Sequence, residues 1–182
     1  HGGHNWPPMA FNRKTGLVYI PTSNQSEPYM YDPAVGYDSA RGFMGAGGAN
    51  TSLSARLYAE SVYDADPRAP APWTVSGRLI AYNPVQQREV WGVDQVLHYN
   101  GGLLTTANGL LLQGDAQGIF SIRDAENGEV LWQYDVRSGV VAPPITYMVD
   151  GEQYISVLVG WGGIQGQVFQ AVPRLHPGTL YT

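Results

Sequence analysis

Three short segments carry residue types that could bind a planar, polar ligand. Asn5 directly precedes Trp6, so an amide donor stands beside a flat apolar ring. Tyr99 is followed by Asn100 in the same way, and Val141 lies in a third, apolar segment. An indole face can stack on a planar group while an amide donates hydrogen bonds to its oxygens. The alternative for Asn5, which precedes Trp-Pro-Pro, is a turn residue that bonds the backbone.

The sequence predicts neither a metal site nor a catalytic residue in this chain. His1 and His4 are spaced i, i+3, but no further ligand converges with them. The aspartates fall in a long insertion or at turns and strand ends, so none is assigned to catalysis. Cysteine is absent, which excludes internal disulfides, thiolate metal sites and covalent haem attachment within these residues. Trp161 lies in a Gly-flanked turn, where it either lines a substrate funnel or only packs.

Composition favours many short strands and turns over helices. Glycine (23) and proline (13) are abundant, 12% of residues are aromatic, and only 14% are charged. The net charge is −5 and the 10 Lys and Arg are scattered, so no nucleic-acid partner is expected. No apolar run approaches the length of a membrane span. Both ends of the sequence lead us to expect a piece of a longer protein; a processed N-terminus is the alternative.

A repeat of about 41 residues determines the expected fold. Residues 77–91 and 118–132 align without a gap, and the tryptophans that end them are 41 positions apart. Each segment has an alternating apolar run, a polar turn and a second run, which is the pattern of a β-hairpin. Turn signals such as Asn108-Gly109 predict a further hairpin upstream of each segment. Four strands every 40 to 45 residues are typical of a β-propeller blade.

We therefore predict an all-β chain in which residues 1–182 form part of a β-propeller. The expected division is a blade at 1–98 with an insertion at 24–76, a blade at 99–136 and a partial blade at 137–182. The insertion either covers one face of the ring and shapes an entrance or is a solvated loop without a role. Such a chain cannot close a ring, so we expect it to pack against the remainder of the propeller. Inner strands begin near the propeller axis, so the three ligand-binding segments should meet there.

Several motifs, taken in order, resemble one protein family. The two repeated segments resemble the tryptophan-docking motif of quinoproteins: Asp124, Gly128 and Trp132 match, whereas Asn83, Gln87 and Ile122 depart from it. The segments Gly3–Met9, Asn100–Leu103, Gly139–Pro144 and Val159–Gly163 complete the set. Together they resemble the C-terminal blades of quinoprotein alcohol dehydrogenases, which use pyrroloquinoline quinone (PQQ). Details such as Asn-Gly-Gly favour the quinohaemoprotein branch. The resemblance implies the last two to three four-stranded blades of an eight-bladed propeller.

The resemblance also implies a function for the intact parent protein. That function is oxidation of small-molecule alcohols to aldehydes or ketones, by hydride transfer to PQQ. The resemblance assigns Asn5 and Trp6 to PQQ contact, and Tyr99 stands where relatives usually have tryptophan. Asn100 and Val141 are lesser candidates for the cofactor, and Trp161 is the candidate for the substrate funnel. Two alternatives stay open: a PQQ-dependent sugar or polyol dehydrogenase, and a non-enzymatic scaffold propeller.

Other parts of the machinery are expected outside this chain. In the resembled family the carboxylate base and the calcium ligands belong to earlier blades, so these residues alone should be inactive. The resemblance leaves open a haem c domain in the parent and a cytochrome as electron acceptor. It also implies a periplasmic location.

Overall fold

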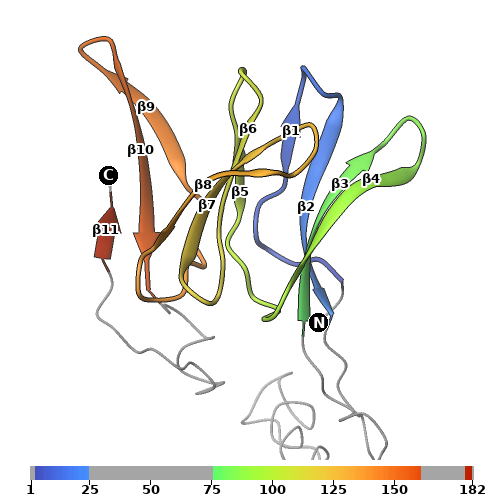
Figure 1. Ribbon diagram of the computed structural model, residues 1–182, viewed down its shortest axis with the longest axis horizontal. Coiled ribbons are helices and arrows are strands. Elements are labelled where there is room, and N and C mark those ends of the chain that lie inside the picture. Colours follow the sequence, from blue (N-terminus) through green and yellow to red (C-terminus); the bar gives the residue numbers. More distant parts are fainter. Residues whose placement is uncertain (1–2, 25–75, 161–178, 182) are drawn as a thin grey trace, which may run out of the picture. The chain divides into compact units, whose positions relative to one another are not determined.

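The computed structural model describes residues 3–24, 76–160 and 179–181. Residues 25–75 of the predicted insertion, with its aromatic residues, and Trp161 lie outside the described residues. The two end residues of the predicted insertion, Asn24 and Ser76, belong to strands. Every regular element of the described part is a β-strand, in agreement with the all-β prediction (Figure 1). These strands belong to one compact unit of the chain.

The described strands form three antiparallel sheets. The first sheet has the order β1 (Ala10–Asn12), β2 (Leu17–Asn24), β3 (Ser76–Asn83) and β4 (Arg88–Gln95). The second has the order β5 (Leu103–Thr105), β6 (Leu110–Gly114), β7 (Ile119–Asp124) and β8 (Val130–Asp135). The third has the order β11 (Thr179–Tyr181), β10 (Glu152–Val159) and β9 (Ile145–Val149). Strand β11, which covers one edge of β10, was not predicted.

The two repeated segments form equivalent hairpins, β3–β4 and β7–β8. Trp91 pairs with Ala81, and Trp132 pairs with Ile122. In each hairpin the register shifts directly after that pair, so an extra residue is inserted at the same place. The shared irregularity confirms the hairpins that the repeat predicted.

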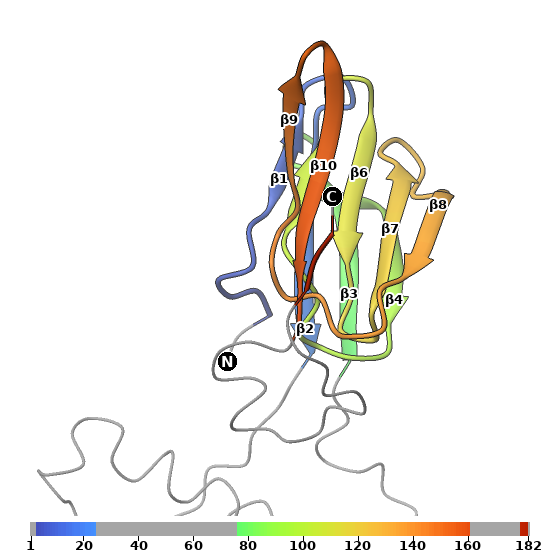
Figure 2. The ribbon, with the colours of Figure 1, turned by 90° about the vertical axis from the view of Figure 1, so that its left-hand side faces the viewer.

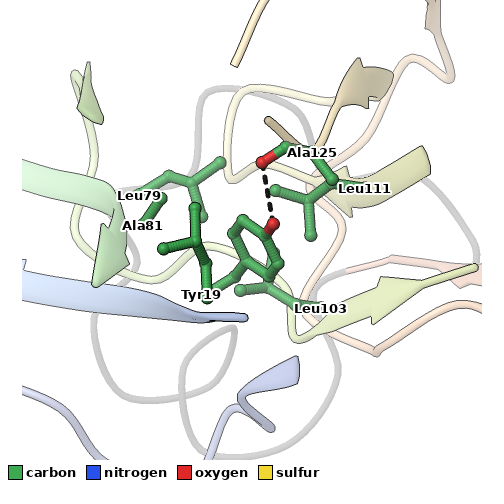
Figure 3. Packing of buried hydrophobic residues seen from close by; sticks show 7 residues of the cluster. Tyr19, Leu79, Ala81, Leu103, Leu111 and Ala125 are labelled. Atoms are coloured by element: carbon green, nitrogen blue, oxygen red, sulfur yellow. Dashed lines mark hydrogen bonds between the residues drawn. The ribbon is translucent and has the colours of Figure 1, made fainter. Parts of the chain in front are cut away.

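A buried cluster joins the first sheet to the second. Tyr19 is fully buried at its centre, and its hydroxyl donates to the carbonyl oxygen of Ala125 at 2.7 Å (Figure 3). The Thr15 hydroxyl lies 2.7 Å from the same phenol oxygen. Burial raises the pKa of Tyr19, which therefore keeps its proton as a hydrogen-bond donor. The other buried members of the cluster are Leu17, Leu79, Ala81, Leu103, Leu111 and Ala125 itself.

Trp91 adds a second contact between these two sheets. Its indole nitrogen donates to Ala125 O at 3.3 Å. Gly128, with a φ of 80°, lies so close that an added Cβ would be 2.8 Å from the indole ring. A side chain at residue 128 would therefore both strain the backbone and displace Trp91.

The second sheet is covered on both faces. Leu111 and Leu112 are adjacent in β6 and both fully buried; Leu111 packs towards the first sheet and Leu112 towards the third. Figure 1 shows this sheet between the other two, and Figure 2 looks along the stack from the side of the third sheet. An apolar groove remains between the second and third sheets, where Trp132 is 49% exposed. Trp132 thus lacks the cover that Trp91 has in the described part of the chain.

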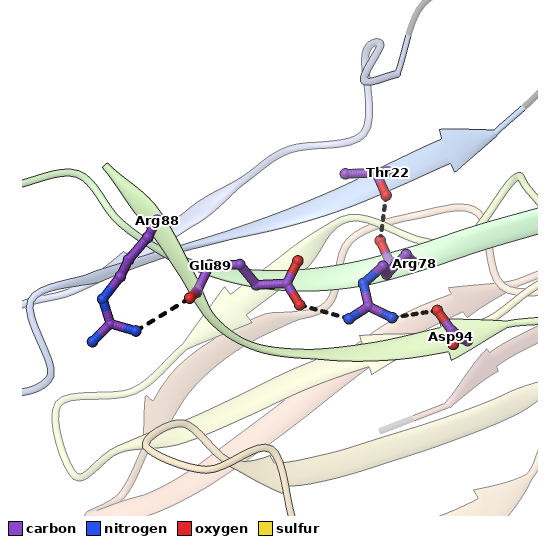
Figure 4. A network of polar contacts seen from close by, with 5 residues as sticks. All are labelled: Thr22, Arg78, Arg88, Glu89 and Asp94. Atoms are coloured by element: carbon purple, nitrogen blue, oxygen red, sulfur yellow. Dashed lines mark hydrogen bonds and ion pairs between the residues drawn. The ribbon is translucent and has the colours of Figure 1, made fainter. Parts of the chain in front are cut away.

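Polar contacts on the outer strands bind the first sheet together at its surface. The Arg78 guanidinium lies between Glu89, at 2.6 Å, and Asp94 (Figure 4). These carboxylates raise the pKa of Arg78. Gly92 leaves room for the guanidinium, since an added Cβ would be 2.6 Å from Arg78 Nη2. Exposed ion pairs of this kind usually contribute little to stability.

Replacing Tyr19 by phenylalanine is expected to lower the free energy of unfolding by about 1 kcal/mol, because a buried hydrogen bond is lost. The Ala125 oxygen would keep only the longer bond from Trp91. Urea denaturation would measure the effect. Tyr134→Phe is the matched control, because Tyr134 is half exposed and should change stability by less than about 0.5 kcal/mol. Equal effects of the two substitutions would contradict this role of Tyr19.

Candidate functional site

The three segments singled out in the sequence meet at Gly102. An added Cβ at this residue would be 2.4 Å from the Pro8 ring and 3.0 Å from the Pro143 ring. The neighbouring Leu103 N–H donates to Pro8 O at 2.9 Å, at the start of β5. The residue before Gly102 is equally close to the third segment, because a Cβ at Gly101 would be 2.9 Å from Val140 O. The structure therefore brings the three segments together, as their places before inner strands predicted.

A small pocket lies beside this junction. Its free space is about that of one water molecule. Two of the predicted binding residues, Asn5 and Tyr99, are part of its wall. None of the described lining residues carries a formal charge when histidine is neutral: Asn5, Pro7, Pro21, Ser23, His98, Tyr99 and Asn100. The pocket can admit a single oxygen atom of a ligand, but it cannot enclose a ring.

The Asn100 amide serves the loop between β4 and β5. Its Nδ2 donates to Leu97 O at 2.8 Å, and its Oδ1 accepts from the Ala116 N–H at 3.0 Å. Gly77 makes room for this arrangement, because a Cβ there would be 2.4 Å from Asn100 Nδ2. Asn100 thus positions the pocket wall from a buried place, which explains its residue type without a ligand.

The remaining predicted binding residues have different surroundings. Tyr99 is buried, and its ring meets that of His98 edge-on, with 4.4 Å between centroids. Asn5 is exposed, and Trp6 next to it is 53% exposed. Trp6 and Val141 do not line the pocket, and Val141 is buried. The structure places three of the five predicted binding residues around one pocket: Asn5, Tyr99 and Asn100.

Sequence reasoning missed His98. Among the histidines, only His1 and His4 have a spacing that drew attention as a possible metal site. The position of His98 directly before Tyr99 was the available signal. Burial lowers the pKa of the His98 imidazole, and burial is the only cause of this shift. By contrast, His4 Nδ1 lies 2.9 Å from Pro21 O and is held to the backbone.

Several of the described carboxylates have structural partners. Asp115 Oδ1 accepts from the N–H groups of Gln117 and Ile119, both at 2.9 Å, and so closes the turn between β6 and β7. Burial raises the pKa of Asp115 despite these bonds. Within residues 3–24, 76–160 and 179–181, no three acidic, His or Cys side chains are grouped as metal ligands would be. The same residues contain no helix able to cross a membrane.

Comparison with known proteins agrees with the predicted fold and with the family that the sequence motifs resemble. Residues 71–155 match the family model described as "Glucose/ethanol/alcohol dehydrogenase, beta-propeller domain". The chain is 42% identical over 182 residues to the quinohemoprotein alcohol dehydrogenase of Comamonas testosteroni, covering 100% of this chain and 24% of that protein. It is 39% identical over 178 residues to the 1-butanol dehydrogenase (cytochrome c) of Thauera butanivorans, covering 98% of this chain and 24% of that protein. The crystal structure of the Comamonas testosteroni enzyme superposes with a TM-score of 0.71 at 37% identity, covering 99% of this chain and 26% of that one.

The described sheets are part of a β-propeller, as the repeat predicted. The chain therefore resembles part of the PQQ-dependent alcohol dehydrogenases, and its residues 71–155 resemble their β-propeller domain. It spans 24% of the length of the two curated relatives named above. The position of these blades within the ring, and the total of eight blades, stay predictions.

Proposed function

We propose that this chain is part of a longer PQQ-dependent alcohol dehydrogenase, called the parent enzyme below. The parent enzyme oxidises primary or secondary alcohols to aldehydes or ketones. The observation that carries the proposal is the 42% identity to a quinohemoprotein alcohol dehydrogenase, which extends over the whole chain. That stretch includes the three segments that meet at Gly102.

The residues at the junction fit a planar, anionic quinone. The exposed indole of Trp6 offers a flat apolar face, and the exposed Asn5 beside it carries an amide that can donate hydrogen bonds. No described lining residue is an acid that would repel an anion. In this proposal Asn5 and Trp6 hold PQQ, while Asn100 holds the loop that carries Tyr99. Bound PQQ would accept the hydride that leaves the alcohol carbon.

The proposal assigns other functions to the rest of the parent enzyme. We place there the carboxylate base that takes the alcohol proton and the calcium ligands, as the family resemblance implies. A calcium ion would act as a Lewis acid on the quinone carbonyl. The name of the Thauera butanivorans relative supports a cytochrome c as electron acceptor. The quinohemoprotein name of the other relative supports a haem in the parent enzyme. We also propose a periplasmic location.

A substrate panel tests the function. Purified parent enzyme, supplied with PQQ and calcium, would be assayed for dye reduction with ethanol, 1-butanol, 2-propanol, glucose and sorbitol. We expect reduction with the simple alcohols and little with glucose or sorbitol. Reduction with the sugar or polyol alone would favour the sugar or polyol dehydrogenase. Failure of every substrate, together with failure to bind PQQ, would favour the scaffold propeller.

Replacing Trp6 by alanine in the parent enzyme is expected to weaken PQQ binding about fivefold or more, because aromatic stacking contributes about 1 kcal/mol beyond the buried area. Equilibrium dialysis with PQQ would measure the dissociation constant. Phe11→Ala is the matched control, because Phe11 is a similarly exposed aromatic residue of β1 (54%) that does not line the pocket. Unchanged affinity in Trp6→Ala would remove the indole from the cofactor site.

A further inference from the structure

His98 presents an unusual side chain to the pocket. Both ring nitrogens are buried, and neither has a hydrogen-bond partner in the described part of the chain. Buried polar atoms in folded proteins almost always have a partner, because leaving one unpaired is costly. A neutral imidazole has one donor and one acceptor nitrogen, so His98 keeps a donor and an acceptor that no described residue uses.

The surroundings of His98 decide what kind of group can bond to these nitrogens. Asn5 and Pro7, from the segment before β1, line the same pocket as His98, and so do Pro21 and Ser23 of β2. Tyr99 is the only titratable side chain among the other described lining residues, and none of them carries a charge. The free space admits one oxygen atom. An oxygen of an anionic ligand fits this space, since its charge would be neither repelled nor already neutralised by these neighbours.

We propose that His98 donates a hydrogen bond from its imidazole to an anionic oxygen of PQQ at the edge of the cofactor. The inference rests on the proposed function and extends it by naming a further cofactor-binding residue. Trp6 would hold the flat face of the quinone outside the pocket, whereas His98 would hold one oxygen inside it. This arrangement agrees with the size of the pocket, which is too small to enclose a quinone ring.

The proposal predicts that cofactor binding depends on pH. In the free protein, burial lowers the pKa of His98, so the imidazole is neutral above its ordinary value of 6.5. An anionic oxygen beside the ring favours the protonated form and raises the pKa in the complex. Binding of PQQ is therefore coupled to the uptake of a proton by His98. As a result, the affinity for PQQ increases as the pH falls from 8 to 6. Uptake of one proton limits the increase to about tenfold per pH unit.

The experiment is a PQQ titration of the cofactor-free parent enzyme, followed by quenching of tryptophan fluorescence at pH 8, 7 and 6. For the unmodified protein we expect the affinity to rise about tenfold from pH 8 to pH 6, within the one-proton limit. His98→Gln keeps a donor but cannot titrate, so its affinity should be independent of pH and about tenfold weaker at pH 6. His4→Gln is the matched control, because its imidazole is bonded to Pro21 O, and it should keep the pH dependence.

The outcomes separate this inference from the proposed function. Equal affinities of the unmodified protein and His98→Gln at every pH would overturn the inference and leave the proposed function standing. A pH-independent affinity of the unmodified protein would also overturn it, even if the variant does not fold. Loss of the pH dependence in His4→Gln would show that the effect does not arise at His98. Failure of the unmodified protein to bind PQQ at any pH would overturn the proposed function itself.

Discussion

Replacing Gly102 by valine is expected to destabilise the parent enzyme by about 3 kcal/mol and to abolish high-affinity PQQ binding. Any Cβ at this residue would overlap the Pro8 ring, at 2.4 Å, and crowd Pro143 on the other side. These neighbours belong to rigid proline rings, so the segments themselves would have to separate. Separation would carry Asn5 and Trp6 away from Tyr99, since all three are held within a few residues of the junction.

Denaturant unfolding and a PQQ titration would measure the two effects of Gly102→Val. Gly3→Ala is the control, because an added Cβ at Gly3 has no atom within 4 Å. It should leave stability unchanged to within about 0.5 kcal/mol. A Gly102→Val variant with normal stability and normal PQQ affinity would show that the three segments need not touch, and the site geometry described above would then be wrong.

The isolated 182-residue chain is expected to show no PQQ-dependent alcohol oxidation and to self-associate. Under the proposed function the carboxylate base and calcium ligands lie elsewhere in the parent enzyme. Trp6 and Asn5 alone would enclose little of a cofactor, whereas binding sites usually bury most of a ligand. Several large apolar side chains are also about half exposed or more, which favours association: Leu131, Trp132, Tyr134, Ile145, Met148 and Leu158.

Dye reduction with ethanol and light scattering would test the isolated chain against the parent enzyme. The edge of β10 is not the expected site of association, because β11 pairs with Val157, Leu158 and Val159. The apolar surface of β8 and β9 is the expected site instead. A monomeric isolated chain with PQQ-dependent ethanol oxidation would contradict both the expected inactivity and the placement of the base outside these residues.

Much of the fold could be predicted because hairpins leave local signals. The alternating runs and polar turns of β3–β4 and β7–β8 were sufficient, and the shared register shift at Trp91 and Trp132 confirms that they are equivalent. Strand β11 was missed because it has only three residues, Thr179–Tyr181, in a segment without a long apolar run. Its assignment depends on pairing with a distant strand, which periodicity cannot reveal.

The site was predictable in part, for a similar reason. The order of the segments along the chain was enough to predict that they meet. The use of each side chain was not predictable, because burial and hydrogen bonding depend on distant residues. Asn100 was considered a lesser cofactor contact, yet its amide bonds Leu97 and Ala116. His98 was overlooked because nothing in its neighbourhood along the chain shows that both ring nitrogens are buried.

The cofactor content of the natural parent enzyme tests the central claim most directly. The enzyme would be purified from a host that makes PQQ, then denatured, and the released small molecules would be identified by mass and quantified against protein. We predict one PQQ for each chain of the parent enzyme. Absence of PQQ in a fully active, alcohol-oxidising preparation, or release of a different redox cofactor in its place, would contradict the account.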